Sequence, residues 1–422
     1  MTDKDEESQA WLSNPLDNAS VEGSATGATV PPPEKPTASA PQPIAFEFRG
    51  NGKEYFKIWI VNLALTIATA GIYSPWAKVR NLRYFYGNTY LDGSAFEFLG
   101  SPIAILKGRI IAVLAFGCYW ITANFYPFAN LFLLPIFALL FPWVFVKTLT
   151  FRSRNSAYRN LTFSYYGSYR KIAAAYLGLP LLMVGAMAAA FMVSGLPMQL
   201  PGAVPMQLSP AVGAKAGILF SVAVLGISLL FPYFYFLQKR VFAEPRNFGD
   251  TPFVFAAGPR DFYRLMFKLS LLSILAVVAV LAVMGVAGVF NKGKAAVAPH
   301  GMLYVSIISI FGFGLFQLLL FVAFKTWTRN LVLSAVRIGE AKVESRLRVL
   351  DVFFLYLSNI IAVICTLGLL IPWAKVRLAR YQMGKTSLTS PEGTENFSGS
   401  PGASASAVGE ELADFFDLDL AI

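Results

Sequence analysis

The sequence predicts an all-α polytopic membrane protein. Six transmembrane helices are expected, with two duplicated re-entrant or spanning segments (six to eight in total) and small cytoplasmic β-hairpins between helices. Three observations predict this class: an apolar composition, long intervals without charge, and an apolar segment that occurs twice. Of the 422 residues, 56% are hydrophobic and 14% are charged, and the mean hydropathy is +0.56. Soluble domains carry about 25% charged residues, so the composition indicates membrane insertion.

Intervals without Asp, Glu, Lys or Arg place the membrane segments. They cover 58–77, 110–146, 172–214, 216–238, 269–291, 295–324 and 352–374. A helix needs about 20 apolar residues to cross a bilayer, and the long interval 110–146 is interrupted at 124–127, as a helical hairpin requires. The pattern predicts six crossings, at about 103–125, 128–147, 172–194, 214–238, 265–290 and 301–325.

One apolar segment occurs twice, 297 positions apart and without a gap. Residues 62–80 align with residues 359–377, and both copies end in Pro-Trp-Ala-Lys-Val-Arg. A Trp at the end of an apolar run settles among lipid headgroups, and the cations after it stay in water or on phosphate. The candidate headgroup-anchoring residues are Trp76, Lys78, Arg80, Trp373, Lys375 and Arg377. They would either grip anionic headgroups specifically or serve as simple interfacial anchors.

Lys and Arg residues crowd every second connector between the predicted spans. The basic connectors are 76–109, 147–171, 239–268 and 325–351, whereas those at 124–127, 195–213 and 291–300 carry little charge. Because positive charge is translocated poorly, the basic loops are predicted to be cytoplasmic.

The duplicated segments fit this rule less directly, because 58–77 and 352–374 have basic clusters at both ends. Each also carries helix-weakening residues midway, at 69–71 and 366–368. Re-entrant or interfacial segments with both termini cytoplasmic are the favoured interpretation. The alternative is eight spans with an inverted pair, a layout common in transporters.

Short alternating apolar patterns in the basic connectors predict β-hairpins. Phe96-Glu-Phe98 and Phe253-Val-Phe255 follow Asp92-Gly93 and Gly249-Asp250, which are typical of two-residue turns. Several hairpins on one face could pair into a cytoplasmic sheet. Alternatively they are isolated amphipathic loops on the headgroups, because a lone hairpin is marginally stable.

Charge and complexity divide the chain into three regions. Residues 1–45 hold two Lys against seven acids and are rich in Pro, Ser and Ala, so this tail is expected to be disordered. Residues 46–385 form the membrane domain, whose duplicated segments extend over 46–101 and 343–400.

The C-terminal region, 386–422, holds seven acids and no base and is expected to be a second disordered tail. Within it, 410–420 carries a short amphipathic motif that could dock on a protein partner. The overall net charge of +11 therefore conceals a more basic membrane domain. Cations beside apolar runs indicate a membrane surface rather than nucleic acid, because no base-reading element accompanies them.

Three stretches of the membrane domain carry a family resemblance. They are Phe48-Arg-Gly50-Asn-Gly-Lys-Glu-Tyr55-Phe56, residues 62–80, and Asn88-Thr89-Tyr-Leu-Asp92-Gly93 with Phe96. Together they resemble the YjgN-type family of bacterial inner-membrane proteins, a family of unknown function. The resemblance covers about 46–385 and implies a multi-pass protein of the bacterial cytoplasmic (inner) membrane, without supplying catalytic residues. The second copy departs from the pattern after Lys385, where it lacks the Asp-Gly turn, and its hairpin is in doubt.

The sequence predicts no enzyme, no metal site and no cofactor. A single histidine, His300, excludes a His-based metal site or a Ser-His-Asp triad within one subunit. The polar residues inside the membrane are Asn62, Thr66, Thr69, Asn359 and Thr366. Either the two copies face each other and these residues form a shared intramembrane polar site, or each amide bonds a neighbouring helix as a packing contact.

Two functions fit these observations. The first is a permease or channel-like protein for a small solute or lipid, suggested by the duplicated and interrupted polar segments. The second is a non-transporting scaffold that organises envelope proteins through the cytoplasmic hairpins and the acidic tail. The expected partners are the lipid bilayer with its anionic headgroups and a protein that binds the 410–420 motif.

Overall fold

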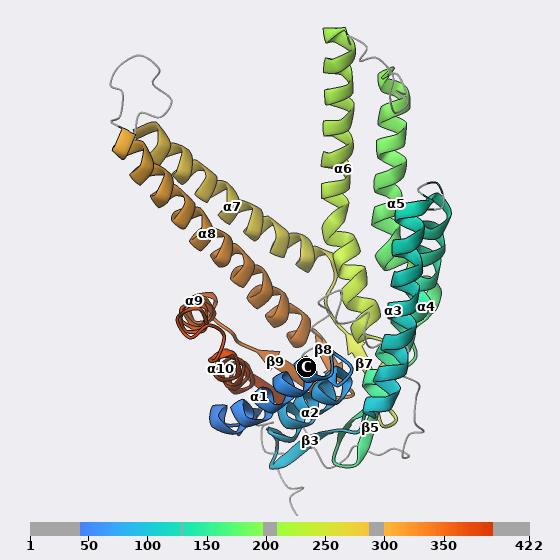
Figure 1. Cartoon of the computed structure of the whole chain (residues 1–422), viewed down its shortest axis with the longest axis vertical. Coiled ribbons are helices and arrows are strands. Elements are labelled where there is room, and N and C mark those ends of the chain that lie inside the picture. Colours follow the sequence, from blue (N-terminus) through green and yellow to red (C-terminus); the bar gives the residue numbers. More distant parts are fainter. Residues whose placement is uncertain (1–42, 127, 129, 197–208, 287–298, 391–422) are drawn as a thin grey trace, which may run out of the picture. The chain divides into compact units, whose positions relative to one another are not determined.

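The computed structural model describes residues 43–126, 128, 130–196, 209–286 and 299–390, in which strand, helix, helix and strand follow one another five times (Figure 1). The helices are α1 (Gly52–Ala68), α2 (Ser74–Gly87), α3 (Pro102–Phe125), α4 (Asn130–Arg154), α5 (Tyr169–Ser194), α6 (Pro210–Ala243), α7 (Pro259–Val286), α8 (Pro299–Ser334), α9 (Val349–Cys365) and α10 (Ile371–Gly384). The strands are β1 (Pro43–Phe48), β2 (Thr89–Leu91), β3 (Ser94–Phe98), β4 (Ser156–Tyr158), β5 (Leu161–Tyr165), β6 (Arg246–Phe248), β7 (Thr251–Phe255), β8 (Val336–Ile338), β9 (Ala341–Ser345) and β10 (Thr386–Thr389). The 410–420 motif lies outside the described residues, so its docking role stays a prediction.

The ten strands of the described chain form one closed antiparallel barrel. The two strands of each unit pair with one another, and β1 closes the barrel against β10, with Pro43 opposite Thr389. The helical, multi-pass part of the predicted fold class stands, but the class is not all-α: the small hairpins predicted between helices are joined into one barrel. Closure pairs both edges of every strand, so it satisfies backbone groups that a lone hairpin would leave open.

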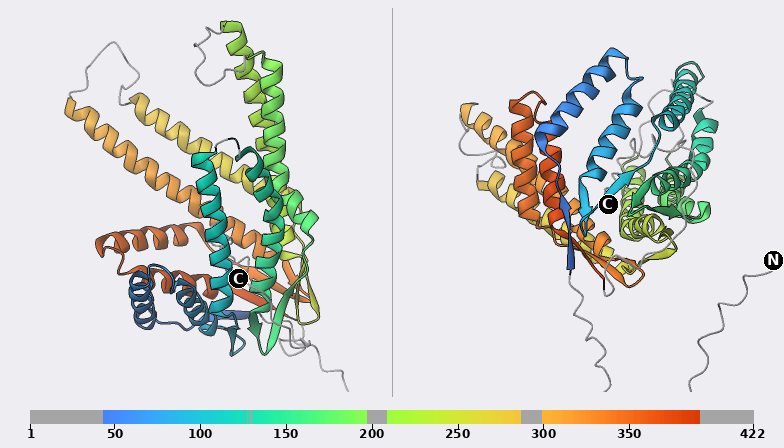
Figure 2. Two further views of the ribbon diagram at one scale, coloured as in Figure 1. Left: turned by 45° about the vertical axis from the view of Figure 1, so that its right-hand side comes forward. Right: turned by 90° about the horizontal axis from the view of Figure 1, so that it is seen from below.

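Two-residue turns join each unit to the next. Asp92 and Gly93 have φ angles of 48° and 73°, and Arg159 and Asn160 have 49° and 63°. Positive φ at both turn residues matches the twist of the flanking strands. Because each helical pair is inserted between two strands that are neighbours in the barrel, all five helical pairs leave from one end and the turns lie at the other (Figure 2).

Six helices in the described part of the chain are long and apolar enough to cross a membrane. They are Pro102–Phe125, Leu131–Arg154, Tyr169–Ser194, Pro210–Ala243, Pro259–Ala279 and Ile310–Ser334, which confirms the predicted six. Several extend further toward the barrel than predicted. The basic residues after the apolar run, such as Lys147 and Lys239, continue the helix almost to the first strand residue.

Each duplicated segment folds as a helical hairpin rather than as a single helix. Two successive residues with positive φ form each turn: Ala70 (48°) and Gly71 (91°) in the first, Leu367 (50°) and Gly368 (94°) in the second. The strands that flank each hairpin pair with one another, so both of its ends lie at the barrel. With 17 residues, α1 and α9 are about 26 Å long, shorter than the roughly 30 Å hydrocarbon core. The re-entrant interpretation of these two hairpins stays a prediction.

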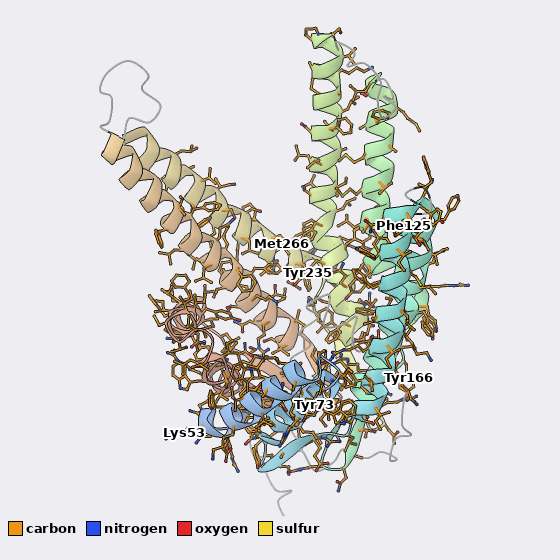
Figure 3. All side chains as sticks on the ribbon, viewed as in Figure 1. Lys53, Tyr73, Phe125, Tyr166, Tyr235 and Met266 are labelled. Atoms are coloured by element: carbon orange, nitrogen blue, oxygen red, sulfur yellow. The ribbon has the colours of Figure 1, made fainter. Side chains whose placement is uncertain are left out.

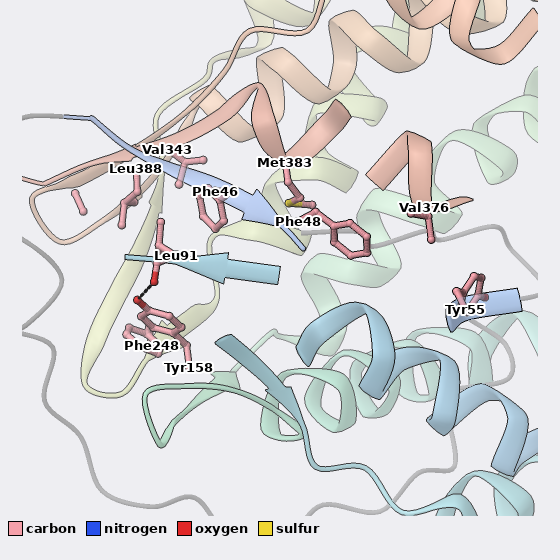
Figure 4. Close-up of a cluster of buried hydrophobic side chains, with 11 residues drawn as sticks. Phe46, Phe48, Tyr55, Leu91, Tyr158, Phe248, Val343, Val376, Met383 and Leu388 are labelled. Atoms are coloured by element: carbon pink, nitrogen blue, oxygen red, sulfur yellow. Dashed lines mark hydrogen bonds between the residues drawn. The ribbon is translucent and has the colours of Figure 1, made fainter. Parts of the chain in front are cut away.

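The described helices form a closed ring at their end of the barrel. Each helix contacts the next one along the chain, and α10 contacts α1. The largest hydrophobic core lies inside the barrel and continues into α1 and α10, where Tyr55, Val376 and Met383 pack against it (Figure 4). The space where the ring meets the barrel is therefore enclosed by elements from both ends of the sequence.

Candidate functional site

A cavity of about 400 Å³ lies where the helical ring meets the barrel. Every strand contributes at least one side chain to its lining, and the residues nearest the middle of the barrel are Phe46, Leu91, Phe96, Tyr158, Phe163, Phe248, Phe253, Ile338, Val343 and Leu388. Side chains along a strand alternate between two faces, so the apolar residue in each short alternating run points inward. The rest of the lining comes mainly from α6, α8, α9 and α10.

The ten strand residues form five cross-strand pairs, one in each unit. Phe46 lies opposite Leu91, Phe96 opposite Tyr158, Phe163 opposite Phe248, Phe253 opposite Ile338, and Val343 opposite Leu388. The aromatic rings also touch across units: the Tyr158 and Phe248 ring centroids are 6.1 Å apart. The Tyr158 hydroxyl donates to the Leu91 backbone carbonyl at 2.7 Å (Figure 4). The barrel end of the cavity is thus an apolar, largely aromatic floor.

Cations from two neighbouring units line the cavity above this floor. Lys239 comes from α6, Arg246 from the start of β6, and Lys325 and Arg329 from α8. None of the described residues that line the cavity is Asp or Glu. Tyr235 of α6, labelled in Figure 3, also lines it and packs against Phe324 of α8, with ring centroids 5.6 Å apart.

Among the four cavity cations, Arg246 lies on a strand and the other three lie on α6 and α8. The Arg246 side chain is buried, with 8% of its surface exposed. Its guanidinium carbon lies 4.0 Å from the centroid of the Phe242 ring, and its Nε has no hydrogen-bond partner among the described residues. Burial lowers the pKa of Arg246 to about 10, so the side chain remains a cation at neutral pH. The hydroxyl of Thr326, also in the lining, is buried and lacks a partner in the same described region.

The cations depart from the pattern of the other units. Lys239 and Arg329 stand seven residues before the first residue of β6 and β8, and the corresponding residues before β2, β4 and β10 are Leu82, Leu149 and Ala379. Arg246 is the first residue of its strand. The other short strands begin with Thr89, Ser156, Val336 and Thr386. A position at which one unit carries a different type of residue from the other units is expected at a functional site.

The predicted intramembrane polar residues make their hydrogen bonds within their own hairpins. Asn62 donates to the Ala77 carbonyl at 3.5 Å and to the Asn81 side chain at 3.3 Å. Asn359 donates to the Ala374 carbonyl at 3.4 Å, the corresponding contact. Neither Asn62 nor Asn359 lines the cavity.

The three predicted threonines bond the preceding turn of their helices. Thr66 donates to the Asn62 carbonyl, Thr69 to Leu65 and Thr366 to Ala362. Thr69 and Thr366 also accept from backbone N–H groups four residues later, which ties the helix end to the hairpin turn.

The candidate anchoring residues lie on the return helices of the two hairpins. Trp76, Lys78 and Arg80 are on α2, and Trp373, Lys375 and Arg377 are on α10. The return helices begin next to the hairpin turns, so both Trp residues lie near the tips rather than at the barrel end. Arg377 donates to Ser358 and Asn359 of α9 at 2.7 and 3.2 Å and stacks on Trp373 at 5.2 Å.

The cavity cations were not among the predicted site residues. Lys239, Lys325 and Arg329 belong to connectors that the distribution of charge marks as cytoplasmic, where a cation needs no further explanation. A signal was present nonetheless: once the units are aligned on their short strands, Lys239 and Arg329 occupy a position that is otherwise Leu or Ala.

Comparison with known proteins gives the family. A family model described as "Bacterial protein of unknown function (DUF898)" matches residues 43–415. The chain is 27% identical over 212 residues to the inner membrane protein YjgN of Salmonella typhimurium (48% of this chain, 49% of that protein). It is 28% identical over 157 residues to YjgN of Escherichia coli K12 (36% of this chain, 38% of that protein). It thus spans about half or less of these relatives, and no solved structure matches. Because the family model covers most of the sequence, the chain belongs to the DUF898 family, and the curated relatives it matches are YjgN proteins, the type its residues resemble.

Proposed function

We propose that this protein is a multi-pass protein of the bacterial inner membrane that acts as a permease-like carrier for a small solute or lipid, with the cavity as its binding site. The observation that carries the proposal is the cavity itself, which joins an apolar barrel interior to charged side chains at the base of membrane-length helices. Concave sites with an apolar lining and a few convergent polar groups are the usual form of small-molecule sites.

The charges support a placement of the barrel on the cytoplasmic side. The four basic connectors each contain one β-hairpin of the barrel, so their cations gather at one end of the six long helices. Under the positive-inside rule this end is cytoplasmic. The cavity then lies at the level of the cytoplasmic headgroups, and the hairpins α1–α2 and α9–α10 enter the bilayer from the same side.

A carrier agrees with the contacts better than an open channel does. Large side chains point into the barrel from every strand, and rings such as Phe96 and Tyr158 are in contact, with centroids 4.7 Å apart. A barrel interior filled in this way is a packed core rather than a water-filled pore. Passage through it would require these side chains to move.

Scaffolding by strand addition receives no support from the barrel. A partner that adds a strand needs an exposed sheet edge, and each strand in the described chain is paired on both sides. The acidic tail that would provide the other contact lies outside the described residues.

Flux measurements in proteoliposomes test the proposal. The purified full-length protein is reconstituted, and uptake is measured for a panel of labelled organic anions, neutral solutes and fluorescent lipids. We expect saturable flux of at least one compound. Val343→Trp should abolish it, because this side chain points into the cavity; Val254→Trp, on the outward face of β7, should not. No flux of any compound by folded protein, or equal flux in both variants, would contradict the proposal.

A further inference from the structure

The geometry points to an anionic amphiphile as the ligand of the cavity: a phosphate or carboxylate headgroup held by Lys239, Arg246, Lys325 and Arg329, with a single acyl-type chain against the aromatic floor. The inference rests on the proposed function for its location and extends it by naming the chemical class of the ligand. Three independent features of the cavity carry it: its charge, its unsatisfied polar atoms and its shape.

The described residues of the lining carry positive charge and include no Asp or Glu. Lys239 and Arg329 are partly buried and Arg246 is buried beside the cavity, whereas Lys325, which also lines it, is exposed. Like charges brought together away from water are unfavourable unless an opposite charge joins them. An anionic group at this point would interact with all four side chains, and Arg offers the planar fork that binds phosphate or carboxylate with two parallel hydrogen bonds.

Unsatisfied donors mark where that group would bind. The Nε of Arg246 is buried and has no hydrogen-bond partner in the described part of the molecule, and the same holds for the Thr326 hydroxyl. Buried polar atoms without partners are uncommon in folded proteins and call for an explanation. The oxygens of an anionic headgroup would accept from both.

The pattern among the units argues against a purely structural role for these cations. Leu82, Leu149 and Ala379 show that an apolar residue fits at the position of Lys239 and Arg329, and Thr89 and Ser156 show that a small hydroxyl residue fits at the position of Arg246. The barrel closes in all units, whichever residue is present. The cations of the described cavity lining therefore come from two units, the one that contains α6 and the one that contains α8.

The lining and the volume of the cavity indicate that the ligand also has an apolar chain. Below the cations the lining consists of Phe46, Phe96, Phe163, Phe248 and Phe253 with aliphatic neighbours. These side chains offer no hydrogen bonds, so a small inorganic anion would leave them without contacts. A volume of about 400 Å³ is at the lower end of the range for small-molecule sites, which favours one chain over the two chains of a phospholipid.

Equilibrium binding to the full-length protein in a non-ionic detergent tests the inference. The probe is radiolabelled lysophosphatidate, and the competitors are lysophosphatidylcholine of the same chain length, the matching fatty acid and inorganic phosphate. We expect lysophosphatidate and the fatty acid to compete at least tenfold more strongly than lysophosphatidylcholine or phosphate. Equal competition by lysophosphatidylcholine would overturn the charge requirement, and equal competition by phosphate would overturn the requirement for a chain.

Variants locate the site. Lys239→Gln and Arg329→Gln should each weaken lysophosphatidate binding about tenfold, the usual effect of losing one charged hydrogen bond. Arg264→Gln on the exposed face of α7 should leave binding unchanged. Arg246→Lys keeps the charge where Arg246→Gln does not, so it should bind even if the Gln variant fails to fold. Unchanged binding in both Lys239→Gln and Arg329→Gln would overturn the assignment.

Failure of this inference and failure of the proposed function are distinguishable. Lysophosphatidate binding without flux of any compound would overturn the carrier function and leave the ligand class standing. Flux of a neutral solute without lysophosphatidate binding would overturn the ligand class and leave the carrier function standing.

Discussion

Lys239 of α6 and Arg329 of α8 occupy the same position in neighbouring units, seven residues before the strand that follows each helix, and both line the cavity. At this position the remaining units carry Leu82, Leu149 and Ala379. The unit therefore folds without a cation at this position. Replacing either cation with Leu should not lower the stability of the protein, whereas changing a buried residue usually does.

Lys239→Leu and Arg329→Leu are expected to leave the midpoint of thermal unfolding unchanged or to raise it, because replacing partly buried charges with apolar groups is often neutral or stabilising. The midpoint can be measured by differential scanning fluorimetry in detergent. Leu149→Lys is the matched reverse change at a fully buried counterpart and should lower the midpoint. A large fall in both Leu variants would mean that the cations hold the fold together.

Asn62→Leu is expected to destabilise the protein by about 1–3 kcal/mol, since it removes the hydrogen bonds to the Ala77 carbonyl and to the Asn81 side-chain oxygen. Chemical or thermal unfolding in detergent measures the change. Val61→Leu, on the exposed face one residue earlier, is the control. Ligand binding in the cavity should be unaffected by Asn62→Leu, and a selective loss of binding would favour the shared polar site between the two hairpins.

Gly50→Ala should destabilise the protein by about 1–3 kcal/mol through overpacking. A methyl group there would lie 2.6 Å from the Phe48 ring, which covers the glycine, whereas Gly87 has open space for one. Gly87→Ala is the control and should be near neutral. In β9 the sizes are exchanged, with Ser345 at the position of Phe48 and Leu347 at that of Gly50. Unfolding free energies that are equal for the two Ala variants would contradict this account of the close contact.

Tyr55→Phe is expected to reduce the loss of stability at alkaline pH. Burial raises the pKa of Tyr55 from 10.0 to about 12. A raised folded-state pKa contributes stability that is complete below pH 10 and is lost as the pH rises through 12. Its full size is roughly 2–3 kcal/mol. The hydroxyl has no hydrogen-bond partner within the described residues, so the Phe variant should match the parent at pH 7.

Unfolding free energies of the parent and Tyr55→Phe, compared from pH 7 to pH 12, check this prediction. The two curves should coincide near neutrality and separate above pH 10, with the parent falling more steeply. Parallel curves over the whole range would show that Tyr55 does not ionise with the expected penalty.

Membrane sidedness can be tested by thiol labelling of intact cells. With Cys118 and Cys365 replaced by Ser, a cysteine at Asn160 in a barrel turn should be protected from an impermeant reagent, and one at Phe128 between α3 and α4 should react. The six long helices separate these two positions, which are both exposed on the protein. Labelling of Asn160→Cys from outside would invert the proposed orientation.

The helical part of the fold could be predicted because each span carries its own signal. The charge-free intervals locate all six long helices, and Asp92-Gly93 marks a turn whose φ angles require it. The weakened Thr69-Ala-Gly71 stretch likewise marked the place where the hairpin reverses. These features depend on residues close together in the sequence.

The barrel could not be predicted in the same way, because its closure joins β1 to β10 over more than 300 residues and β10 has no aromatic alternation. The missing Asp-Gly turn in the second copy now has a reason: β10 pairs with β1 instead of turning into another strand of the described chain. Lys239, Arg246 and Arg329 could not be told apart from the many other Lys and Arg residues of the basic connectors. They stand out only when the five units are aligned on the strands of the barrel.

Photocrosslinking in native membranes addresses the central claim most directly. A lysophosphatidate with a photoreactive group at the end of its chain is added to membranes that contain the full-length protein, and the labelled peptides are identified by mass spectrometry. The account predicts labelling of inward-facing strand residues such as Phe163 and Phe253, and its loss in Lys239→Gln/Arg329→Gln. Labelling confined to exposed residues of the long helices, such as Ile111 of α3, and unchanged in that variant, would contradict it.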